Sequence, residues 1–390
     1  MTLISQFEFQ TKVFVKLDSP LYAVLATGIA QDIGEGGPCA KALAGFADAT
    51  RDSVVPLRFL AAVHALVLSG AAPGLARYYP SATPQAAPPD AETWPAFRAV
   101  VAEQIPWIAT WLDTPPRAPQ TNEVGRAVPL MSGLLAAVDA IPLPVRLLEL
   151  GSSAGLNLRA DHFRWRAGDL EWGPADSPVD LGNAWQGPVP EWLTAAVRRH
   201  PTLDVIERRG CDPAPLDPLT QRGAVTLRSY VWPDRSGRAE RLAGALRIAE
   251  QVPADVITSS ARDFLAEAHL VPGTLTVVWH SVMRQYVDPA EWRAVTAELD
   301  RLAAASTPEA GFAYIAFEGQ NNSDDRHGFR LTARIGNGPE IILARAKPHG
   351  VPAYLHPADF RLPRPADSPA PQSYCDAETP GTKSSRRRSA

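Results

Sequence analysis

The first third of the chain carries apolar side chains at helical spacing. Over residues 57–68 they form one stripe. The stripe consists of Leu57, Leu60, Ala61, Ala65 and Leu68. His64 falls on the same stripe and is predicted to be a histidine of the core or of a helix interface. A second helical pattern, over residues 94–112, is split or kinked at Pro106. Together these patterns predict an N-terminal helical region over residues 1–119.

Beyond residue 120, short apolar runs alternate with helical patterns. Five runs are predicted to be strands: Val145–Leu150, Leu203–Arg208, Ala254–Thr258, Thr274–His280 and Gly311–Glu318. Helical patterns over Arg238–Glu250 and Pro289–Ala305 separate several of them, which is typical of βαβ units in a mainly parallel sheet. Two later runs, Phe329–Ile335 and Glu340–Ala346, flank a Gly/Asn turn and predict an antiparallel hairpin. The fold class is therefore α/β, with a Rossmann-like sheet ending in an antiparallel hairpin.

These patterns divide the chain into three parts. The helical region is followed by a Rossmann-like domain over residues 120–360, which carries a tryptophan-rich insert at about 164–200. The last part is rich in Pro, Ser and Ala and contains three consecutive arginines near its end. Because such a sequence cannot bury apolar area, residues 361–390 are predicted to be a disordered tail.

Composition narrows the class of protein. The 390 residues are 45% hydrophobic and 21% charged, which is typical of a globular protein with a buried core. A formal net charge of -4 argues against a whole-chain nucleic-acid binder. Three distant cysteines exclude a disulfide scaffold or a cysteine-built metal site and suit a reducing compartment. With neither a signal-peptide pattern nor an apolar run long enough for a bilayer, the sequence predicts a cytoplasmic protein without a membrane partner.

The strongest chemical signal is a turn of small residues after the first predicted strand. Residues 146–158 read Arg-Leu-Leu-Glu-Leu-Gly-Ser-Ser-Ala-Gly-Leu-Asn-Leu. Gly151 is free to adopt a positive φ, and Gly155 lets the following helix pack close to the strand. The dinucleotide pattern G-x-G-x-x-G is absent, and Glu149 would repel a pyrophosphate but suit a cationic ligand. A tight β–α turn that holds no ligand is the structural alternative.

This turn resembles the first motif of class I S-adenosylmethionine-dependent methyltransferases, whose cofactor carries an ammonium and a sulfonium. In open α/β sheets such ligands lie above the carboxyl ends of the strands. The resemblance implies cofactor-binding positions at Glu149, Gly151, Ser153, Gly155 and Asn157.

Two further segments extend the resemblance. The second predicted strand leads into Gly-x-Asp-x-x-Pro, similar to the second methyltransferase motif, in which the acid, here Asp212, accepts hydrogen bonds from both ribose hydroxyls. A turn-capping aspartate before proline is the alternative. After the third strand, Ser259, Ser260 and Ala261 replace the Gly-Asp-Ala of methyltransferases, and the nearest acid is Asp263. This departure implies adenine recognition by Ser260 or Asp263, or a degraded adenine site.

His280 and Arg126 are the remaining candidate site residues. His280 stands at the carboxyl end of the fourth predicted strand, and a histidine has a suitable pKa for a general base near neutral pH. A structural histidine bonded to a neighbouring loop is the alternative. Arg126 ends the polar segment before the first strand. This segment either folds over the crevice, with Arg126 on a cofactor or substrate carboxylate, or is a helix N-cap.

In combination, several sequence blocks resemble an uncharacterised bacterial family known only as a domain of unknown function. The blocks are Thr121–Arg126, Leu148–Leu158, Asp176–Pro178, Arg209–Asp212 with Pro215–Asp217, Val231–Pro233 and Val277–Ser281. The resemblance covers roughly residues 5–355. It implies a Rossmann-like core similar to that of methyltransferases and brings no established substrate.

The leading hypothesis is an S-adenosylmethionine-dependent methyltransferase acting on a small or medium organic acceptor. Catalysis would be mostly positioning, because the sulfonium already activates the methyl group. The second hypothesis is a non-catalytic adenosyl- or nucleotide-binding module that regulates or scaffolds. Other enzymes on the same fold lack support, since no Gly-x-Ser-x-Gly, His-Glu-x-x-His or P-loop pattern occurs. The expected partner is a small molecule rather than nucleic acid, no metal site is expected, and the oligomeric state is left open.

Overall fold

Proline fixes the starts of most helices in the first part of the chain. The computed structural model describes residues 2–50, 53–114, 119–319, 328–356 and 359. Its first helices are α1 (Leu3–Lys16), α2 (Pro20–Gly34), α3 (Pro38–Ala42), α4 (Val55–Leu68), α5 (Pro73–Ala76), α6 (Thr93–Glu103) and α7 (Ile105–Asp113). Five of these, α2, α3, α4, α5 and α7, carry proline in the first turn, where a missing N–H breaks no helical hydrogen bond. The predicted helix over residues 94–112 is two helices that meet at Gln104.

These helices share one hydrophobic core, with α4 buried along almost its whole length. His64 is fully buried on α4, as its place on the apolar stripe predicts. Its Nδ1 lies 3.0 Å from the carbonyl oxygen of Ser229, at the end of α10 (Gln221–Ser229). Trp232 follows α10 and packs its ring 4.8 Å from that of Phe14. A segment from the second half of the sequence therefore completes the helical core.

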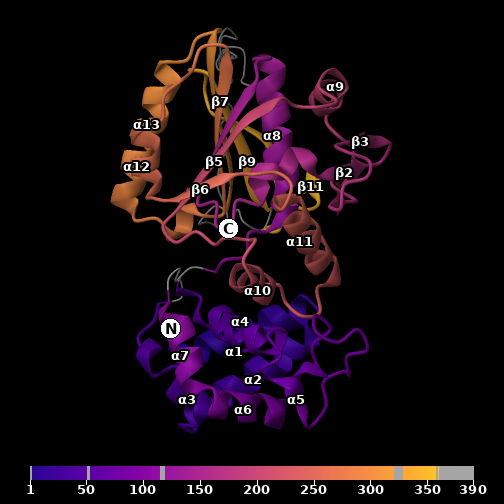
Figure 1. Cartoon of the computed structure of the whole chain (residues 1–390), viewed down its shortest axis with the longest axis vertical. Coiled ribbons are helices and arrows are strands. Elements are labelled where there is room, and N and C mark those ends of the chain that lie inside the picture. The colour runs from indigo at the N-terminus through magenta and orange to yellow at the C-terminus, as the bar shows by residue number, and fades with distance from the viewer. Residues whose placement is uncertain (1, 51–52, 115–118, 320–327, 357–358, 360–390) are drawn as a thin grey trace, which may run out of the picture. The chain divides into compact units, whose positions relative to one another are not determined.

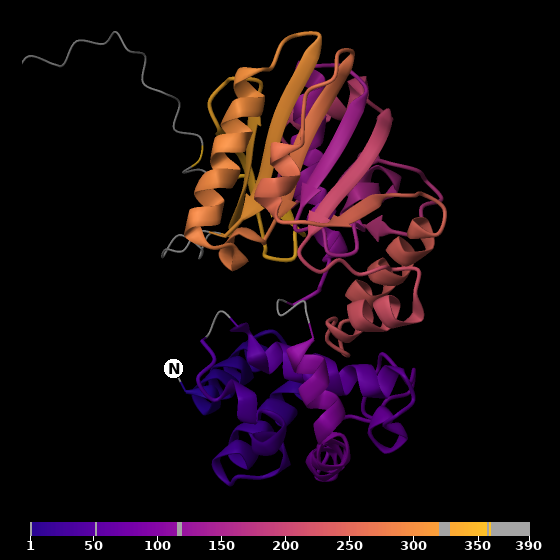
Figure 2. The ribbon, with the colours of Figure 1, turned by 60° about the vertical axis from the view of Figure 1, so that its left-hand side comes forward.

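The second part is built on an eight-stranded sheet (Figures 1 and 2). In spatial order its strands are β6 (Asp255–Thr258), β5 (Val205–Asp212), β1 (Val145–Leu150), β7 (Thr274–Ser281), β8 (Ala310–Glu318), β9 (Phe329–Ile335), β10 (Ile341–Ala346) and β11 (Ala353–Tyr354). The five strands from β6 to β8 pair in parallel, and the last three are antiparallel additions. The predicted α/β fold is confirmed, including the hairpin of β9 and β10.

The order of the parallel strands places a topological switch point between β1 and β7. From β1 the chain adds β5 and β6 on one side, then returns to add β7 and β8 on the other. Connections leaving β1 and β7 therefore diverge, and in open α/β sheets ligands typically bind at such a point, beyond the carboxyl ends of the strands. This is the edge where the turn after β1 and His280 are found.

Each face of the sheet buries its own set of side chains. On one face α8 (Ala127–Ala140) packs against residues such as Leu147, Val277 and Ile315. On the other, α12 (Ala261–Ala266) and α13 (Pro289–Ala304) cover Leu148 and Val278 (Figure 1). α11 (Ser236–Ala249) belongs to the α8 side of the core. Both faces are covered, as the continuous apolar strands require.

The tryptophan-rich insert is a small sheet of its own. It consists of β2 (Arg164–Ala167), β3 (Leu170–Trp172) and β4 (Asp180–Leu181), followed by α9 (Glu191–Arg199). Trp165 and Trp172 are buried with their rings 6.4 Å apart, and they join the core on the α8 side. The insert therefore extends the main core.

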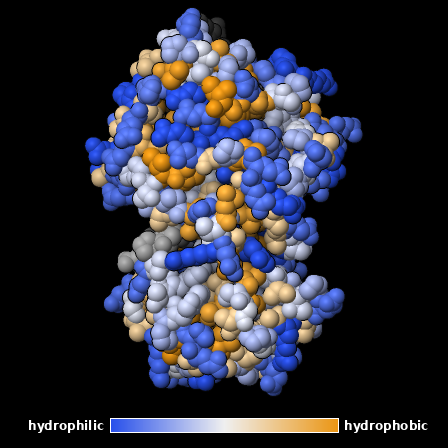
Figure 3. Space-filling view, viewed as in Figure 1, coloured by the Kyte–Doolittle hydropathy of each residue, from blue (hydrophilic) through white to orange (hydrophobic). Residues whose placement is uncertain are grey.

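On the face shown in Figure 3, hydrophobic residues form several small groups separated by hydrophilic ones. Among the described residues, no helix combines the length and the apolar character that crossing a membrane would need. The predicted tail over residues 361–390 lies outside the part of the chain that the structure describes.

Candidate functional site

The turn after β1 uses left-handed backbone at residues of two kinds. Gly151 has φ 64° and Ser153 has φ 55°. Ser153 is held there by its backbone N–H, which donates to Asp212 Oδ2 at 3.0 Å, and by its hydroxyl, which donates to Gln120 Oε1. Strained non-glycine backbone of this kind tends to cluster at ligand sites. The predicted turn is confirmed, whereas the helix expected after it is only the short 3-10 helix η4 (Asn157–His162).

Two glycines of the turn admit close neighbours. At Gly155, where φ is 64°, an added Cβ would lie 2.7 Å from Cγ2 of Val256 on β6. Gly155 therefore allows a close approach to β6, whereas the sequence predicts close packing of a following helix on the first strand. At Gly151 an added Cβ would lie 2.9 Å from Cβ of Met283, in the loop after β7. The Met283 side chain thus packs directly on Gly151.

Glu149 is a buried carboxyl group with an unsatisfied oxygen. The residue is 2% exposed, and Oε2 has no hydrogen-bond partner among the described residues. Burial raises the pKa of Glu149 to about 8; the charge of Asp212 acts in the same direction, while Arg159 and the Trp279 indole oppose it. Arg159 directs its own N–H groups to the carbonyls of Val252 and Gly155, at 2.6 and 2.8 Å. The carboxyl group is therefore protonated at neutral pH and lacks a built-in cationic partner.

Asp212 ends β5, and its two oxygens are used by the backbone. Oδ2 accepts from the N–H of Ser153 and Oδ1 from that of Ala214, at 3.0 and 2.9 Å. Burial raises the pKa of Asp212, and both hydrogen bonds oppose this shift. The acid thus joins the end of β5 to the turn after β1. Each carboxylate oxygen keeps a second lone pair, so this role leaves further acceptor capacity.

The polar segment before α8 lies against the turn. Asn122, which has φ 33°, accepts the N–H of Leu156 on Oδ1 at 3.0 Å. Glu123 accepts the N–H of Gly125 and forms a buried ion pair with Arg238, at 2.6 Å. Glu123 is therefore the N-cap of the 3-10 helix at Val124–Arg126, while Asn122 stabilises the turn after β1.

Arg126 lies at the start of α8. Its Nε donates to the carbonyl oxygen of Pro348 at 3.2 Å. Burial lowers the pKa of Arg126, and the negative charges of Glu123 and Glu318 oppose the shift. No described residue forms an ion pair with it. A contact of Arg126 with a cofactor or substrate carboxylate stays a prediction.

The remaining residues predicted to bind the cofactor are Asn157, Ser260 and Asp263. Asn157 is buried; its Nδ2 donates to the carbonyl oxygen of Glu123, and its Oδ1 has no described partner. Ser260 is the N-cap of α12 and accepts the N–H of Asp263 at 3.1 Å. The Asp263 side chain is 65% exposed and lies 3.5 Å from Arg262. Adenine recognition by either residue stays a prediction.

His280 is placed on the other face of the sheet from Glu149. In the parallel register Glu149 pairs with Trp279, and His280 pairs with Leu150, so their side chains point in opposite directions. His280 is fully buried, and both ring nitrogens have partners: Nδ1 is 2.7 Å from Glu318 Oε1, and Nε2 is 2.7 Å from the hydroxyl of Tyr314. Both partners lie on strand β8 rather than on a loop, so the expected loop contact is not found, and a role as general base stays a prediction.

Glu318 and Met283 are contributors that sequence reasoning missed. Besides His280, Glu318 accepts the N–H of Met283 at 2.9 Å, and thereby holds the loop after β7 beside the turn. Val282 in this loop has φ 52°, a strained conformation for a β-branched residue. An acid at the carboxyl end of the fifth parallel strand is the signal that would have pointed to Glu318.

A charged cavity of 260 Å³ lies on the His280 side of the sheet, between α13 and the strands β7 to β9. Arg284, Arg334 and Glu340 line it together with His280 and Glu318. No cluster of three or more His, Cys, Asp and Glu side chains capable of holding a metal ion occurs among the described residues.

Comparison with known proteins identifies the family. The profile of a family described as "Uncharacterized protein conserved in bacteria (DUF2332)" matches residues 5–354. Neither the curated proteins nor the solved structures include a significant match.

Proposed function

The chain belongs to this family of uncharacterised bacterial proteins, and from its own site we propose that it is an S-adenosylmethionine-dependent methyltransferase acting on a small or medium organic acceptor. Glu149 is the observation that carries the proposal. It stands at the carboxyl end of β1, beside the switch point of the sheet, with a buried oxygen that no described residue satisfies. A ligand that brings N–H donors and a positive charge would remove this cost. The methionyl ammonium of the cofactor has both.

The other residues fit the cofactor to different degrees. Gly151 lacks the side chain that would crowd the turn, and Met283 is the group against which a ligand there would pack. Asp212 keeps lone pairs for ribose hydroxyls while it holds the turn. Ser260 already caps α12, so it offers the adenine a weaker contact. The fit is best at the amino-acid end of the cofactor.

The bound cofactor would supply an electrophilic methyl group on its sulfonium. The residues of the chain then have three tasks, which are to bind the ammonium, to orient the acceptor and to exclude water. Ionised Glu149 performs the first. His280 holds Glu318, which in turn holds the loop with Met283, so we propose His280 as a positioning residue. General-base catalysis by His280 would require its Nε2 to leave the Tyr314 hydroxyl.

Calorimetry tests the proposal. S-adenosylmethionine and S-adenosylhomocysteine, which share the ammonium, should bind the purified protein, and NAD should not. Because Glu149 must lose its proton to bind a cation, affinity should rise about tenfold per pH unit below pH 8. Titrations in two buffers of different ionisation enthalpy should show proton release that is absent in Glu149→Gln.

Glu267→Gln is the matched acidic control, since Glu267 is exposed and lies outside the predicted cofactor-binding positions. It should change the affinity less than twofold, whereas Glu149→Gln should weaken binding at least tenfold at pH 8. Absence of binding at millimolar cofactor, or equal affinities for wild type and Glu149→Gln, would refute the proposal.

A non-catalytic adenosyl-binding module is the second candidate. It is favoured by the saturation of both ring nitrogens of His280 and by Ser260 in place of an acid. Such a module would bind both adenosyl ligands with the same dependence on Glu149. It would show no conversion of S-adenosylmethionine to S-adenosylhomocysteine with any acceptor tried.

A further inference from the structure

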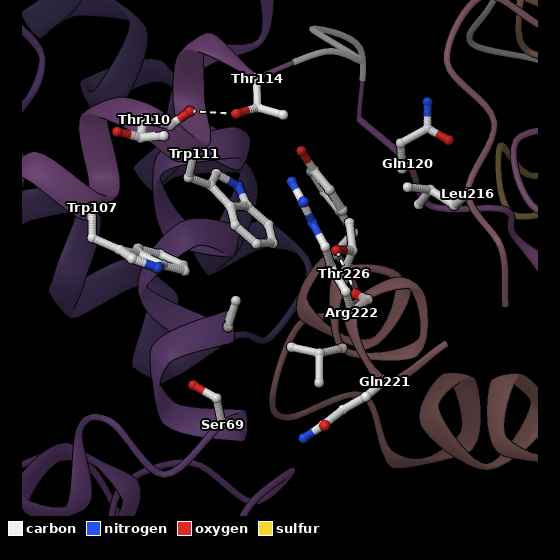
Figure 4. A pocket seen from close by; sticks show the side chains of 13 residues that line it. Ser69, Trp107, Thr110, Trp111, Thr114, Gln120, Leu216, Gln221, Arg222 and Thr226 are labelled. Atoms are coloured by element: carbon white, nitrogen blue, oxygen red, sulfur yellow. Dashed lines mark hydrogen bonds between the residues drawn. The ribbon is translucent and has the colours of Figure 1, made fainter. Parts of the chain in front are cut away.

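A pocket of 510 Å³ lies close to the glycine turn (Figure 4). Ligand pockets for small molecules typically measure about 300–1,000 Å³. Its walls come from α4, α7 and α10, and from the two connecting segments that hold Gln120 and Leu216. Gln120 Oε1 accepts a hydrogen bond from the hydroxyl of Ser153. The N–H of Leu216 donates a hydrogen bond to the carbonyl oxygen of Ser153 at 3.2 Å. One residue of the turn is thus bonded to two residues of the pocket wall.

One wall of the pocket is aromatic. Trp107 and Trp111 of α7 stack with their ring centroids 5.2 Å apart and their planes at 27°. Trp107 is 38% exposed, and Trp111 is half-buried. In Figure 4 the two indoles stand on the side of the pocket that faces α10. A stacked pair that is partly open to the pocket provides a flat apolar surface suited to a planar ligand.

The opposite wall carries a cation and an unpaired hydroxyl. Arg222 of α10 is the one charged residue among the described residues of the lining, and no described residue pairs with its guanidinium. Figure 4 shows its side chain directed across the pocket toward Trp111. Tyr230 is only 7% exposed, and its hydroxyl has no described hydrogen-bond partner. The pocket therefore offers a tyrosine hydroxyl that can form a hydrogen bond, beside a cation that no described residue pairs with.

We propose that this pocket binds a planar aromatic carboxylate, with its ring against Trp111, its carboxylate on Arg222 and a polar atom on the Tyr230 hydroxyl. Arginine matches the planar geometry of a carboxylate in a bidentate contact, and no acidic side chain of the described lining competes for it. Binding of this ligand is independent of the methyltransferase proposal. Its further role as the methyl acceptor rests on that proposal, because Ser153 joins the pocket to the cofactor turn.

Indole-3-carboxylate is the probe, and its neutral amide is the matched ligand. Tryptophan fluorescence and calorimetry should show the acid binding at least tenfold more tightly than the amide, without any adenosyl compound present. Arg222→Gln should weaken binding of indole-3-carboxylate tenfold or more, so that the acid and the amide bind with similar affinity. Arg228→Gln, on the same helix but outside the pocket, should change the affinity less than twofold.

Two results would overturn the pocket assignment: no binding of the acid up to 10 mM, or equal losses in Arg222→Gln and Arg228→Gln. Equal binding of acid and amide would reject the carboxylate. Trp111→Leu should abolish the fluorescence change and weaken both ligands, and a variant that binds both normally would reject the aromatic wall. If the acid binds as expected while S-adenosylmethionine does not, the pocket stands and the methyltransferase proposal fails.

Discussion

A single carboxyl group, Glu149, sets the chemistry of the turn because of its burial. With a pKa raised to about 8, the folded protein binds a proton there that the unfolded chain releases near pH 4.3. The groups that face it are Arg159, Asp212 and the Trp279 indole, and none of them neutralises it. A buried carboxyl group with a shifted pKa and no neutralising partner is expected where a ligand completes the site.

The stability of the protein should reveal this group. The folded state binds more protons than the unfolded chain between pH 4.3 and 8. The contribution of Glu149 to the free energy of unfolding is therefore fully present below pH 4.3 and is lost as the pH rises to 8. The slope is at most about 1.4 kcal/mol per pH unit. Denaturant unfolding should therefore find Glu149→Gln similar to wild type at pH 5 and more stable at pH 8.5. A constant difference across this range would show that Glu149 ionises normally.

His280 allows the positioning role to be separated from base catalysis. His280→Ala leaves the Tyr314 hydroxyl without a described partner and Glu318 with only backbone N–H donors of the loop after β7, which should cost about 2–5 kcal/mol of stability. Cofactor affinity should fall only through the displaced loop that holds Met283. His280→Asn should be less destabilised, because it keeps polar contacts.

Turnover decides between the two roles once an acceptor is known. A general base typically contributes about 10²–10⁴-fold, so both variants would be equally slow if His280 removed a proton. With a positioning role, rate per folded molecule should recover in His280→Asn, and the pH–rate profile should keep its wild-type shape in both variants.

At the scale of elements, His64 links α4 to α10 through a buried hydrogen bond. Its Nδ1 lies beside the carbonyl oxygen of Ser229, and its Nε2 lies 2.7 Å from the Ser81 hydroxyl. Burial lowers the pKa of His64 to about 4, and the charge of Arg228 adds to this, while the contact with Ser229 opposes it. The ring is therefore neutral in the folded protein at neutral pH. The wall of the aromatic pocket that α10 provides depends on this contact.

His64→Leu should destabilise the protein by about 1–3 kcal/mol at pH 7, because the carbonyl of Ser229 loses its donor. A lowered folded-state pKa gives stability that is present above about pH 6.5 and is lost as the pH falls toward 4. The difference between wild type and His64→Leu should therefore shrink in that window. The exposed His269 is the control, since His269→Gln should give a difference that does not change with pH in this way. If the difference in free energy of unfolding between wild type and His64→Leu stayed constant down to pH 4, the lowered pKa of His64 would be contradicted.

At the scale of the whole molecule, residues Met1–His356 form one compact unit that contains both the helical core and the sheet. The helical core is formed by buried residues up to Leu112, with Trp232 packed against it, and the core around the α8 face of the sheet begins at Val124. The contact of Trp232 explains why the connection between β5 and α11 contains a helix of its own, α10, which packs on α4.

Deletion of residues 366–390 should leave the melting temperature and the affinity for ligands unchanged within error. The reason is compositional, since a segment rich in Pro, Ser and Ala has little apolar surface to bury. Thermal unfolding of full-length and shortened protein checks this. A loss of several degrees would show that the segment docks on the rest of the chain.

The sequence by itself determined the elements and the turn. Apolar runs between breakers located β1, β7 and β8 to within one residue, because a strand buried on both faces has few sequence solutions. The small residues after β1 similarly indicated a tight turn with Gly151 at positive φ, whereas the positive φ of Gly155 is seen only in the structure. Proline positions indicated where helices begin or are interrupted.

Only the tertiary structure decided which groups meet. Local pattern cannot show that Glu149 and His280 point to opposite faces, since this depends on the register of β1 against β7. Nor can it show that Asp212 is engaged by the backbone of Ser153, or that α10 crosses to the helical core and forms a pocket with Trp111. These contacts join residues far apart in the chain. Long-range packing therefore determined which polar groups are satisfied and which, like Oε2 of Glu149, have no partner among the described residues.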